Sequence, residues 1–408
     1  MKVLIVSQYF PPENVPIPSD VAADLRARGH SVRVITGFPS YPLGRVFPGY
    51  RQRWRQRSME DCVEVCRVPL YVDHSQSTVK RMLNYITFAL SSASARRFVR
   101  GADAIYVYAT QMTPALGPWL WRMTGGAPYV LHVQDLWPDS ITGSSLSGGG
   151  RKARLMELVL NPWIGRVYRR AAAVIGIAPT MVETLVERGV SAERAELVFN
   201  WARNLSADPE TVPKSSKTPN GRVVYAGNVG DMQDLETAIR AAAASAESGV
   251  TLSIIGEGVA KARLQHLASE LGATNIDFRA AVPPTQMASV YAEADFALVT
   301  LKDLPAFRGT VPSKFQAALA HGLPVVTTVQ GDVRRLAEER GVGFTADAES
   351  IDDLARAFRE AARCTGAERA EMAVRSKETA QRLFSRDEAI ARIEEILRRA
   401  AEERKIGK

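Results

Sequence analysis

The sequence predicts an α/β protein built from two doubly wound domains that face a cleft. Two observations carry this prediction. Short apolar runs alternate with segments of helical periodicity, which is the pattern of parallel strands joined by crossover helices. A polar, proline-containing stretch interrupts the alternation near the middle of the chain, and the same scheme then resumes. A chain of 408 residues, 46% of them hydrophobic, is long enough for two cores.

The first half begins with a strand and continues as an alternation of strands and helices. A helix is expected over 20–28, between the first two strands. Each of the other strands is a short apolar run. The predicted strands are 3–6, 32–36, 104–108, 129–132 and 173–177.

A linker then separates the two halves. It is polar and contains Pro209, Pro213 and Pro219, which are typical of an exposed connection. We therefore place the domains at 1–203 and 204–385.

The second half repeats the scheme of the first. Its predicted strands are 223–226, 252–255, 275–278, 296–299 and 324–327, and its helices begin near Asp234, Val259, Pro284 and Ser313. The segment 386–408 has apolar side chains at helical spacing, so we expect a helix that packs back on the first domain. These side chains are Ala389, Ile390, Ile393, Ile396 and Leu397.

The positive charge belongs to the first half. Residues 1–200 contain 24 Lys and Arg against 15 Asp and Glu, whereas the whole chain has a net charge of +8. Two basic clusters with interleaved apolar residues suit either an anionic membrane surface or a solvated face. One contains Arg45, Arg51, Arg53, Arg55 and Arg57 with Phe47, Tyr50 and Trp54; the other contains Arg151, Lys152, Arg154, Arg166, Arg169 and Arg170 with Leu155, Leu158, Trp163 and Ile164.

Several classes of function are disfavoured. No recognition-helix, zinc-finger or RNA-binding signature is present, so we expect no nucleic-acid partner. Cys62 and Cys66 lack a second close pair of ligands, so we predict no metal site and interpret them as buried small hydrophobic residues. The apolar runs are too short to cross a bilayer. Neither a complete dinucleotide fingerprint nor a Walker motif occurs.

Two glycine turns in the second half follow predicted strands. Gly227-Asn228-Val229-Gly230 leads into the helix near Asp234, and Gly256-Glu257-Gly258 follows the next strand. Glycines at such turns let backbone amides approach a phosphate, although each turn could equally be a tight connection.

The segment from Arg308 to Lys314 is the other candidate of the second half. Pro312 and Ser313 suit the start of a helix, and Lys314 then lies in its first turn, where the helix dipole disfavours a cation. A bound anion would resolve this conflict, as would simple exposure of Lys314 to water.

In the first half, His132 and Asp135 follow the strand 129–132. Side chains at the carboxyl end of a parallel strand are well placed for chemistry. The loop after the first strand carries Glu13, which is as consistent with a structural carboxylate as with a functional one.

These segments resemble the family 4 retaining glycosyltransferases, whose GT-B fold has two Rossmann-like domains. The resemblance covers nearly the whole chain. It is most similar to the WbuB-like subgroup, which builds capsule, exopolysaccharide or O-antigen units. It rests on VLIVSQYFPPE, LRARGHSVRVITGFPSYPLG and HVQDLWPDS, and on YAGNVGDMQDLETAIRAA, SIIGEGVAKARL and VPSKFQAALAHGLPVV.

The resemblance implies metal-independent transfer of a sugar, an N-acetylated hexose on UDP, to a lipid-linked sugar acceptor, with no cofactor beyond the nucleotide-sugar co-substrate. The acceptor would lie on the first domain, with His132, Asp135 and Glu13 as catalytic residues. The donor would lie on the second domain. Its expected contacts are Gly227, Asn228, Gly230, Gln233, Gly256, Glu257, Arg279, Arg308, Val311, Ser313 and Lys314.

Two departures from the family pattern concern the donor. Many members carry an Arg after the first glycine and a Lys further on, whereas this chain has Asn228 and then Gln233. Many also carry paired glutamates where Gly309 and Ala317 stand here. Lys314 and Arg308 are therefore the cations available to a diphosphate.

Two alternatives stay open beside the transferase. A nucleotide-sugar epimerase of the same fold would convert the donor without an acceptor. A non-catalytic nucleotide-sugar-binding partner would account for the missing cations. For the transferase we expect a cytoplasmic protein held peripherally at the inner face of the plasma membrane, because the first half is basic.

Overall fold

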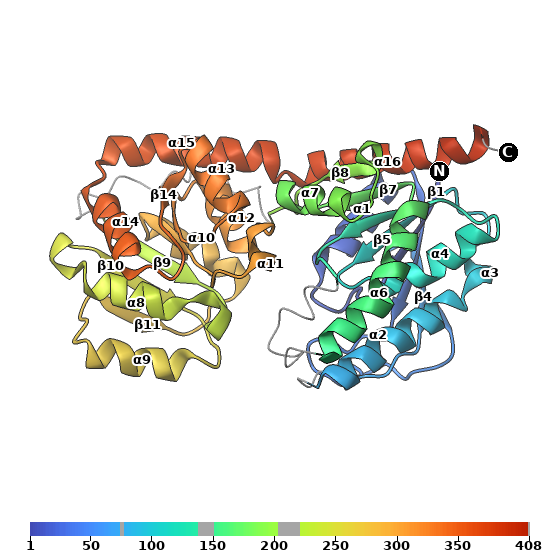
Figure 1. Cartoon of the computed structure of the whole chain (residues 1–408), viewed down its shortest axis with the longest axis horizontal. Coiled ribbons are helices and arrows are strands. Elements are labelled where there is room, and N and C mark those ends of the chain that lie inside the picture. Colours follow the sequence, from blue (N-terminus) through green and yellow to red (C-terminus); the bar gives the residue numbers. More distant parts are fainter. Residues whose placement is uncertain (74–76, 138–150, 203–220, 407–408) are drawn as a thin grey trace. The chain divides into compact units, whose positions relative to one another are not determined.

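The computed structural model describes residues 1–73, 77–137, 151–202 and 221–406, and the chain forms two compact units (Figure 1). Unit 1 contains Met1–Asn200 together with Ala389–Lys408, and unit 2 contains Trp201–Glu388. Each unit is a parallel sheet covered by helices. The predicted α/β fold class is confirmed.

Unit 1 has an eight-stranded sheet in the order β3-β4-β2-β1-β5-β6-β7-β8. All neighbours pair in parallel except β3 and β4. The central strands consist of apolar residues that are buried on both faces, as a sheet covered by helices requires. The strands are β1 Lys2–Ser7, β2 Ser31–Gly37, β3 Gln56–Glu60, β4 Val63–Val68, β5 Ala104–Ala109, β6 Tyr129–Val133, β7 Ala173–Gly176 and β8 Ala195–Leu197.

The helices of unit 1 connect these strands and cover the sheet. Its amphipathic helices bury one face and leave the other in solvent. They are α1 Pro16–Ala27, α2 Thr78–Ala93, α3 Arg96–Val99, α4 Leu116–Met123, α6 Arg151–Arg170 and α7 Pro179–Glu187, with short turns η1 Thr113–Ala115 and η3 Ala192–Arg194.

The helix α16, Arg386–Ile406, belongs to unit 1 from Ala389 onward. Its apolar stripe is fully buried, with Ile390, Ile393, Ile396 and Leu397 all at 0% exposure. Polar contacts tie the same helix to unit 1, because Glu394 accepts from His30 at 2.8 Å and Arg392 donates to Glu196 at 2.7 Å. Burial opposes ionisation of Glu394, but the hydrogen bonds from His30 and Arg398 lower its pKa to about 2.

Unit 2 has a six-stranded, entirely parallel sheet in the order β11-β10-β9-β12-β13-β14. The strands are β9 Arg222–Ala226, β10 Thr251–Ile255, β11 Ile276–Arg279, β12 Phe296–Val299, β13 Val325–Thr327 and β14 Gly343–Thr345. The helices are α8 Leu235–Ala243, α9 Lys261–Glu270, α10 Met287–Ala292, α11 Pro305–Arg308, α12 Ser313–Ala320, α13 Asp332–Arg340, α14 Ile351–Arg363 and α15 Gly366–Leu383, with turns η4 Asp231–Gln233, η5 Ala246–Ser248 and η6 Pro284–Gln286.

The core of unit 2 combines large strand residues with small helix residues. Tyr225, Leu252 and Phe296 lie fully buried in the sheet. The alanine-rich helix α8 packs closely against α14, because alanine lets the two backbones approach. All ten strands that the sequence predicts are present, within about two residues of their expected bounds.

The β3–β4 hairpin departs from the prediction. β3 carries mostly polar side chains and is only half buried, so it has no apolar run by which to recognise it. Cys62 lies in the hairpin turn at a φ of 61° and is exposed, so its interpretation as a buried residue is wrong. Cys66 on β4 is buried as expected.

Candidate functional site

The first glycine turn of unit 2 follows β9, and most of its amides already have acceptors within the protein. Gly227 N donates to the Ile255 carbonyl at 2.9 Å, and Val229 N donates to the Glu257 carbonyl at 2.9 Å. Gly230 N donates to Oε1 of Gln233 at 3.1 Å. These amides are therefore occupied, which at these positions favours the alternative of a tight connection.

The second glycine turn packs against the first. A Cβ at Gly256 would lie 1.9 Å from the Gly227 carbonyl oxygen, and a Cβ at Gly258 would lie 2.2 Å from that of Val229. Both glycines are required by this close approach of two backbones. Lys261, which the sequence did not single out, holds the turn by donating to the carbonyls of Gly256 and Arg279 at 2.8 and 3.0 Å.

Lys314, in the first turn of α12, reaches back to the first glycine turn. Its Nζ lies 4.8 Å from the centre of the Tyr225 ring, and a Cβ at Gly227 would lie 2.4 Å from its Cε. Gly227 has a φ of 141° and leaves the space that Lys314 fills. Burial lowers the pKa of Lys314. Within the described parts of the chain, Lys314 has no carboxylate partner.

The start of α12 adds helix polarity to this ammonium group. Ser313 is exposed at the first position of the helix, and Val311 is buried one residue before Pro312. The unpaired N–H groups and the dipole of a helix N-terminus favour an anion. Lys314, Ser313 and Gly227 thus form what we call the Lys314 site.

Arg308 differs from Lys314 although the two are close in sequence. Its guanidinium pairs with both carboxylate oxygens of Asp303, at 3.0 and 2.8 Å, and its side chain is 53% exposed. The sequence suggested two cations for a diphosphate. Of these two cations, Arg308 has a carboxylate partner, and Lys314 has none among the described residues.

The remaining predicted donor contacts lie at the surface in ion pairs or amide contacts. Arg279, at the end of β11, pairs with Asp277 at 2.7 Å and Glu293 at 3.3 Å. The exposed Glu257 pairs with Lys261 at 2.8 Å. Asn228 donates to Gln233 at 3.3 Å.

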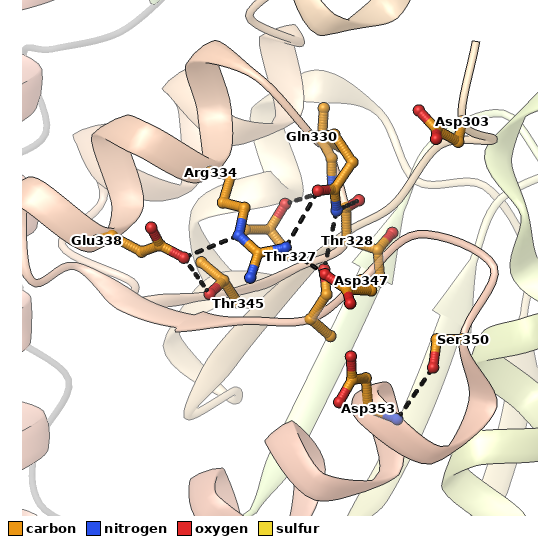
Figure 2. Close-up of polar contacts among 12 residues, drawn as sticks. Asp303, Thr327, Thr328, Gln330, Arg334, Glu338, Thr345, Asp347, Ser350 and Asp353 are labelled. Atoms are coloured by element: carbon orange, nitrogen blue, oxygen red, sulfur yellow. Dashed lines mark hydrogen bonds and ion pairs between the residues drawn. The ribbon is translucent and has the colours of Figure 1, made fainter.

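A polar cluster at the ends of β13 and β14 was not predicted (Figure 2). Arg334 of α13 is at its centre and donates to Glu338 at 2.9 Å and to Gln330 at 3.1 Å, and it also pairs with Asp347. Thr345 donates to Glu338 at 2.8 Å. Because its carboxylates and guanidinium are already paired, we interpret this cluster as a brace for the loops at this edge.

In unit 1, His132 lies inside the core rather than on a surface. Its exposure is 0%, and its Nδ1 lies 2.5 Å from the hydroxyl of Tyr106. The contact follows from register, since His132 pairs with Tyr108 and Tyr106 points to the same face. Burial lowers the pKa of His132 to about 3, so the imidazole is neutral. Its Nε2 has no hydrogen-bond partner among the described residues.

Glu13 uses both carboxylate oxygens inside the protein. Oε1 accepts from the amides of Ser40 and Tyr41, each at 2.8 Å, and Oε2 accepts from Phe10 N at 3.2 Å. Burial raises its pKa, and these bonds oppose the rise. The geometry favours the structural alternative for Glu13, which joins two loops at the carboxyl edge of the sheet.

Asp135 follows β6 and is exposed. Desolvation by the surrounding protein nevertheless raises its pKa to about 6. Of the three predicted catalytic residues, Asp135 is thus the one whose side chain is both accessible and titratable near neutral pH.

Other predicted features are partly described. No three His, Cys, Asp or Glu side chains gather as metal ligands in the described ranges, and none of the helices there is long and apolar enough to span a membrane. The side chains of Arg151, Lys152, Arg154 and Leu155 lie outside the described residues.

Comparisons with known proteins match both units. The glycosyl transferase 4-like domain matches residues 18–201, and the glycosyl transferases group 1 domain matches residues 209–382. The chain is 30% identical over 384 residues to the colanic acid biosynthesis glycosyl transferase WcaI of Escherichia coli K12, covering 88% of this chain and 92% of that protein. The chain belongs to the glycosyltransferases.

Further likenesses come from a second relative and from solved structures. This glycosyltransferase is 25% identical over 356 residues to a GDP-mannose-dependent alpha-mannosyltransferase of Mycobacterium tuberculosis, covering 84% and 83% of the two chains. Anabaena HepE in complex with UDP superposes with a TM-score of 0.67 at 17% identity, covering 97% and 99%. WaaG, a glycosyltransferase involved in lipopolysaccharide biosynthesis, has a TM-score of 0.62 at 18% identity, covering 96% and 98%. The GT-B fold is confirmed.

Proposed function

We propose that this glycosyltransferase moves an N-acetylated hexose from a UDP-sugar to a lipid-linked acceptor in polysaccharide synthesis, with retained anomeric configuration and without a metal ion. The single observation that supports it best is the Lys314 site, where a half-buried ammonium group without a described carboxylate partner adjoins a helix N-terminus. Unit 2 would bind the donor and unit 1 the acceptor. The assignment to the WbuB-like subgroup stays a prediction.

The chemistry of transfer calls for such a site. The bond between the anomeric carbon and the diphosphate oxygen breaks, and its electron pair stays on that oxygen. The acceptor hydroxyl oxygen forms the new bond and loses its proton. A fixed ammonium group and helix amides stabilise the charge that develops on the leaving diphosphate.

In this proposal the other predicted residues take unequal parts. Asp135 is the candidate for receiving the acceptor proton, because its raised pKa lies close to neutral pH. His132 shapes the site through Tyr106 as a neutral group. The identity of the nucleobase in the donor stays open to experiment, because one relative is named for GDP-mannose and one structural neighbour holds UDP.

The proposed membrane partner has support from the surface of unit 1. Helix α2 exposes an apolar stripe of Val79, Leu83, Ile86 and Leu90, of which Val79 is 70% and Leu90 is 60% exposed. Their spacing of four, three and four residues places them on one face of the helix. An apolar face on a basic domain suits peripheral attachment to an anionic bilayer. Location at the inner face of the plasma membrane is part of the proposal.

The test is a transfer assay with a panel of UDP- and GDP-sugars and a polyprenyl-diphosphate-linked sugar as acceptor. Lys314→Ala should lower kcat by about 100- to 1000-fold, which is typical for removal of one group that stabilises transition-state charge. Arg308→Ala is the matched control and should stay within about threefold, because Asp303 already pairs with its charge. Unchanged melting temperatures would show that both variants fold.

The outcomes also separate the alternatives. Conversion of the donor without an acceptor would indicate an epimerase. Donor binding without transfer or conversion would indicate a non-catalytic partner. A full rate for Lys314→Ala would overturn the proposed donor site, and the anomeric configuration of the product, read by NMR, tests retention.

A further inference from the structure

We propose that unit 1 contains a second anion site, a pocket that binds a group whose phosphates carry two or more negative charges. This arginine pocket has a volume of about 740 Å³ and belongs wholly to unit 1. Its arginines come from three separate parts of the sequence. They are Arg55, Arg96, Arg97, Arg100 and Arg404.

The arginine pocket lies at the opposite edge of the sheet from His132. Its lining includes residues 96–97 and 99–102, which precede β5, and residues 124–127, which precede β6. It is therefore at the amino ends of these strands. The helices α3 and α4, both labelled in Figure 1, contribute Arg96, Arg97 and Trp121 to its lining. His132 is close to the carboxyl end of β6, so five or six residues of strand, about 17–20 Å, separate the two edges.

The charge of the arginine pocket has no counterpart among the described residues. Its lining contains no Asp or Glu, and none of its arginines forms an ion pair with a described residue. Where the arginines are bonded, the partners are neutral oxygens. Arg404 donates to the Ala102 carbonyl at 2.9 Å, Arg55 to Oγ of Ser94 at 3.1 Å and Arg96 to the Thr124 carbonyl at 3.4 Å.

These contacts hold several guanidinium groups around one hollow. Arg404 is held in place by α16, which is anchored on unit 1, and Arg55 is tied to the residue that follows α2. Converging like charges repel one another, and an anion in the hollow removes that repulsion. The planar fork of arginine binds phosphate oxygens in pairs, so the chemistry of the lining selects phosphate groups.

The walls leave room for such a ligand. Gly101, Gly125 and Gly126 line the pocket without side chains, and Trp121 and Val99 supply apolar surface. The phosphates could belong to a soluble compound or to a lipid headgroup. The second source is worth testing because Ser94, also in the lining, lies four residues after the exposed Leu90 of the α2 stripe.

The experiment uses the full-length protein saturated with UDP, so that the Lys314 site is occupied, and titrates pyrophosphate by calorimetry. The test variant is Arg97→Gln/Arg100→Gln, since neither side chain makes a hydrogen bond or ion pair with a described residue. The control is Arg51→Gln/Arg53→Gln, which removes the same charge from exposed positions outside the pocket.

We expect the wild type and the control to bind pyrophosphate equally, and the test variant to bind it at least tenfold more weakly. Equal binding by the test variant and the control, or no binding by the wild type, would overturn the proposal. UDP affinity should be the same in all three proteins, so failure here is distinguishable from failure of the donor site.

A second arm identifies the source of the phosphates. Phosphatidylcholine vesicles with and without 30% phosphatidylglycerol are sedimented with each protein. Loss of binding to the anionic vesicles in the test variant, together with competition by pyrophosphate in the wild type, would support a lipid headgroup. Binding of pyrophosphate without any effect on vesicles would support a soluble ligand.

Discussion

Each unit has a parallel sheet whose carboxyl edge carries polar side chains, but the side chains at the two edges differ in how far the protein itself satisfies them. In unit 1, the carboxylate of Glu13 accepts hydrogen bonds from three backbone amides, and His132 is buried against Tyr106. In unit 2, Lys314 has an aromatic face beside it and no described carboxylate. A group satisfied within the protein stabilises the fold, whereas a cation left without a counter-ion is available to a ligand.

Removing the Glu13 carboxylate should have the largest effect. Glu13→Ala leaves the amides of Phe10, Ser40 and Tyr41 without an acceptor and should reduce the free energy of unfolding by about 3 kcal/mol. Glu13→Gln keeps one acceptor and should cost less. Urea unfolding measures both, with the exposed Glu187→Ala as control. Lost activity at unchanged stability would instead place Glu13 at the substrate.

Filling the space beside Lys314 should weaken nucleotide binding. In Gly227→Ala the new methyl group would meet Cε of Lys314 at 2.4 Å, and the φ of 141° adds strain. We expect UDP affinity to fall by about tenfold, or roughly 1.4 kcal/mol. Gly249→Ala is the matched control, because its φ is 82° but nothing lies within 4 Å of the added Cβ. Equal affinities in both variants would contradict the role of Lys314.

The pH dependence of stability should differ in sign between His132 and Asp135. The pKa of His132 is about 3 in the folded protein against 6.5 for an unperturbed histidine, so protonation favours unfolding and stability is lost as pH falls from 6.5 towards 3. His132→Gln should flatten that loss in melting temperatures measured between pH 4 and pH 7. An unchanged slope would show that the imidazole is not buried as a neutral group.

Asp135 should act in the opposite direction. Its pKa is raised to about 6 from 3.8, so ionisation costs stability as pH rises from 4 to 6, and the cost persists at neutral pH. Asp135→Asn should therefore raise the melting temperature at pH 7.5 and leave it unchanged at pH 3.5. In kinetics, the same substitution should remove a limb near pH 6 from the profile of kcat/KM; a limb that survives it would belong to another group.

Arg279 should show the smallest effect. Its two ion pairs are at the surface, where such pairs contribute less than about 1 kcal/mol. Arg279→Ala should shift UDP affinity by less than about threefold. A loss of tenfold or more, measured by calorimetry, would mean that the nucleotide base contacts this side chain.

Patterns local in sequence predicted much of the fold. Buried strands such as 104–108 are continuous apolar runs. Lys314 could be singled out from the sequence because a cation in the first turn of a helix is unfavourable, and helix polarity is a local property. The half-polar strand β3 gave no comparable signal. The burial of His132 depends on Tyr106 in a neighbouring strand, and two of the amides that donate to Glu13 come from a loop far along the chain. Contacts of that kind arise only when the strands pair.

The arginine pocket shows the same limit more strongly. Its basic residues come from the position just before β3, from the segment before β5 and from the last turns of α16. The sequence identified Arg55 only as a member of a charged run. The hollow that these side chains share exists only in the folded unit.

The division of unit 1 has a consequence during synthesis. Its first 200 residues leave the ribosome before unit 2, and Ala389–Lys408 follow about 190 residues later. At about 5–20 residues per second, the nascent unit waits roughly 10–40 s for the helix that completes it. Through that interval the surface that will pack against Ile393 and Leu397 is uncovered. Newly made unit 1 therefore exposes apolar surface of the kind that chaperones bind.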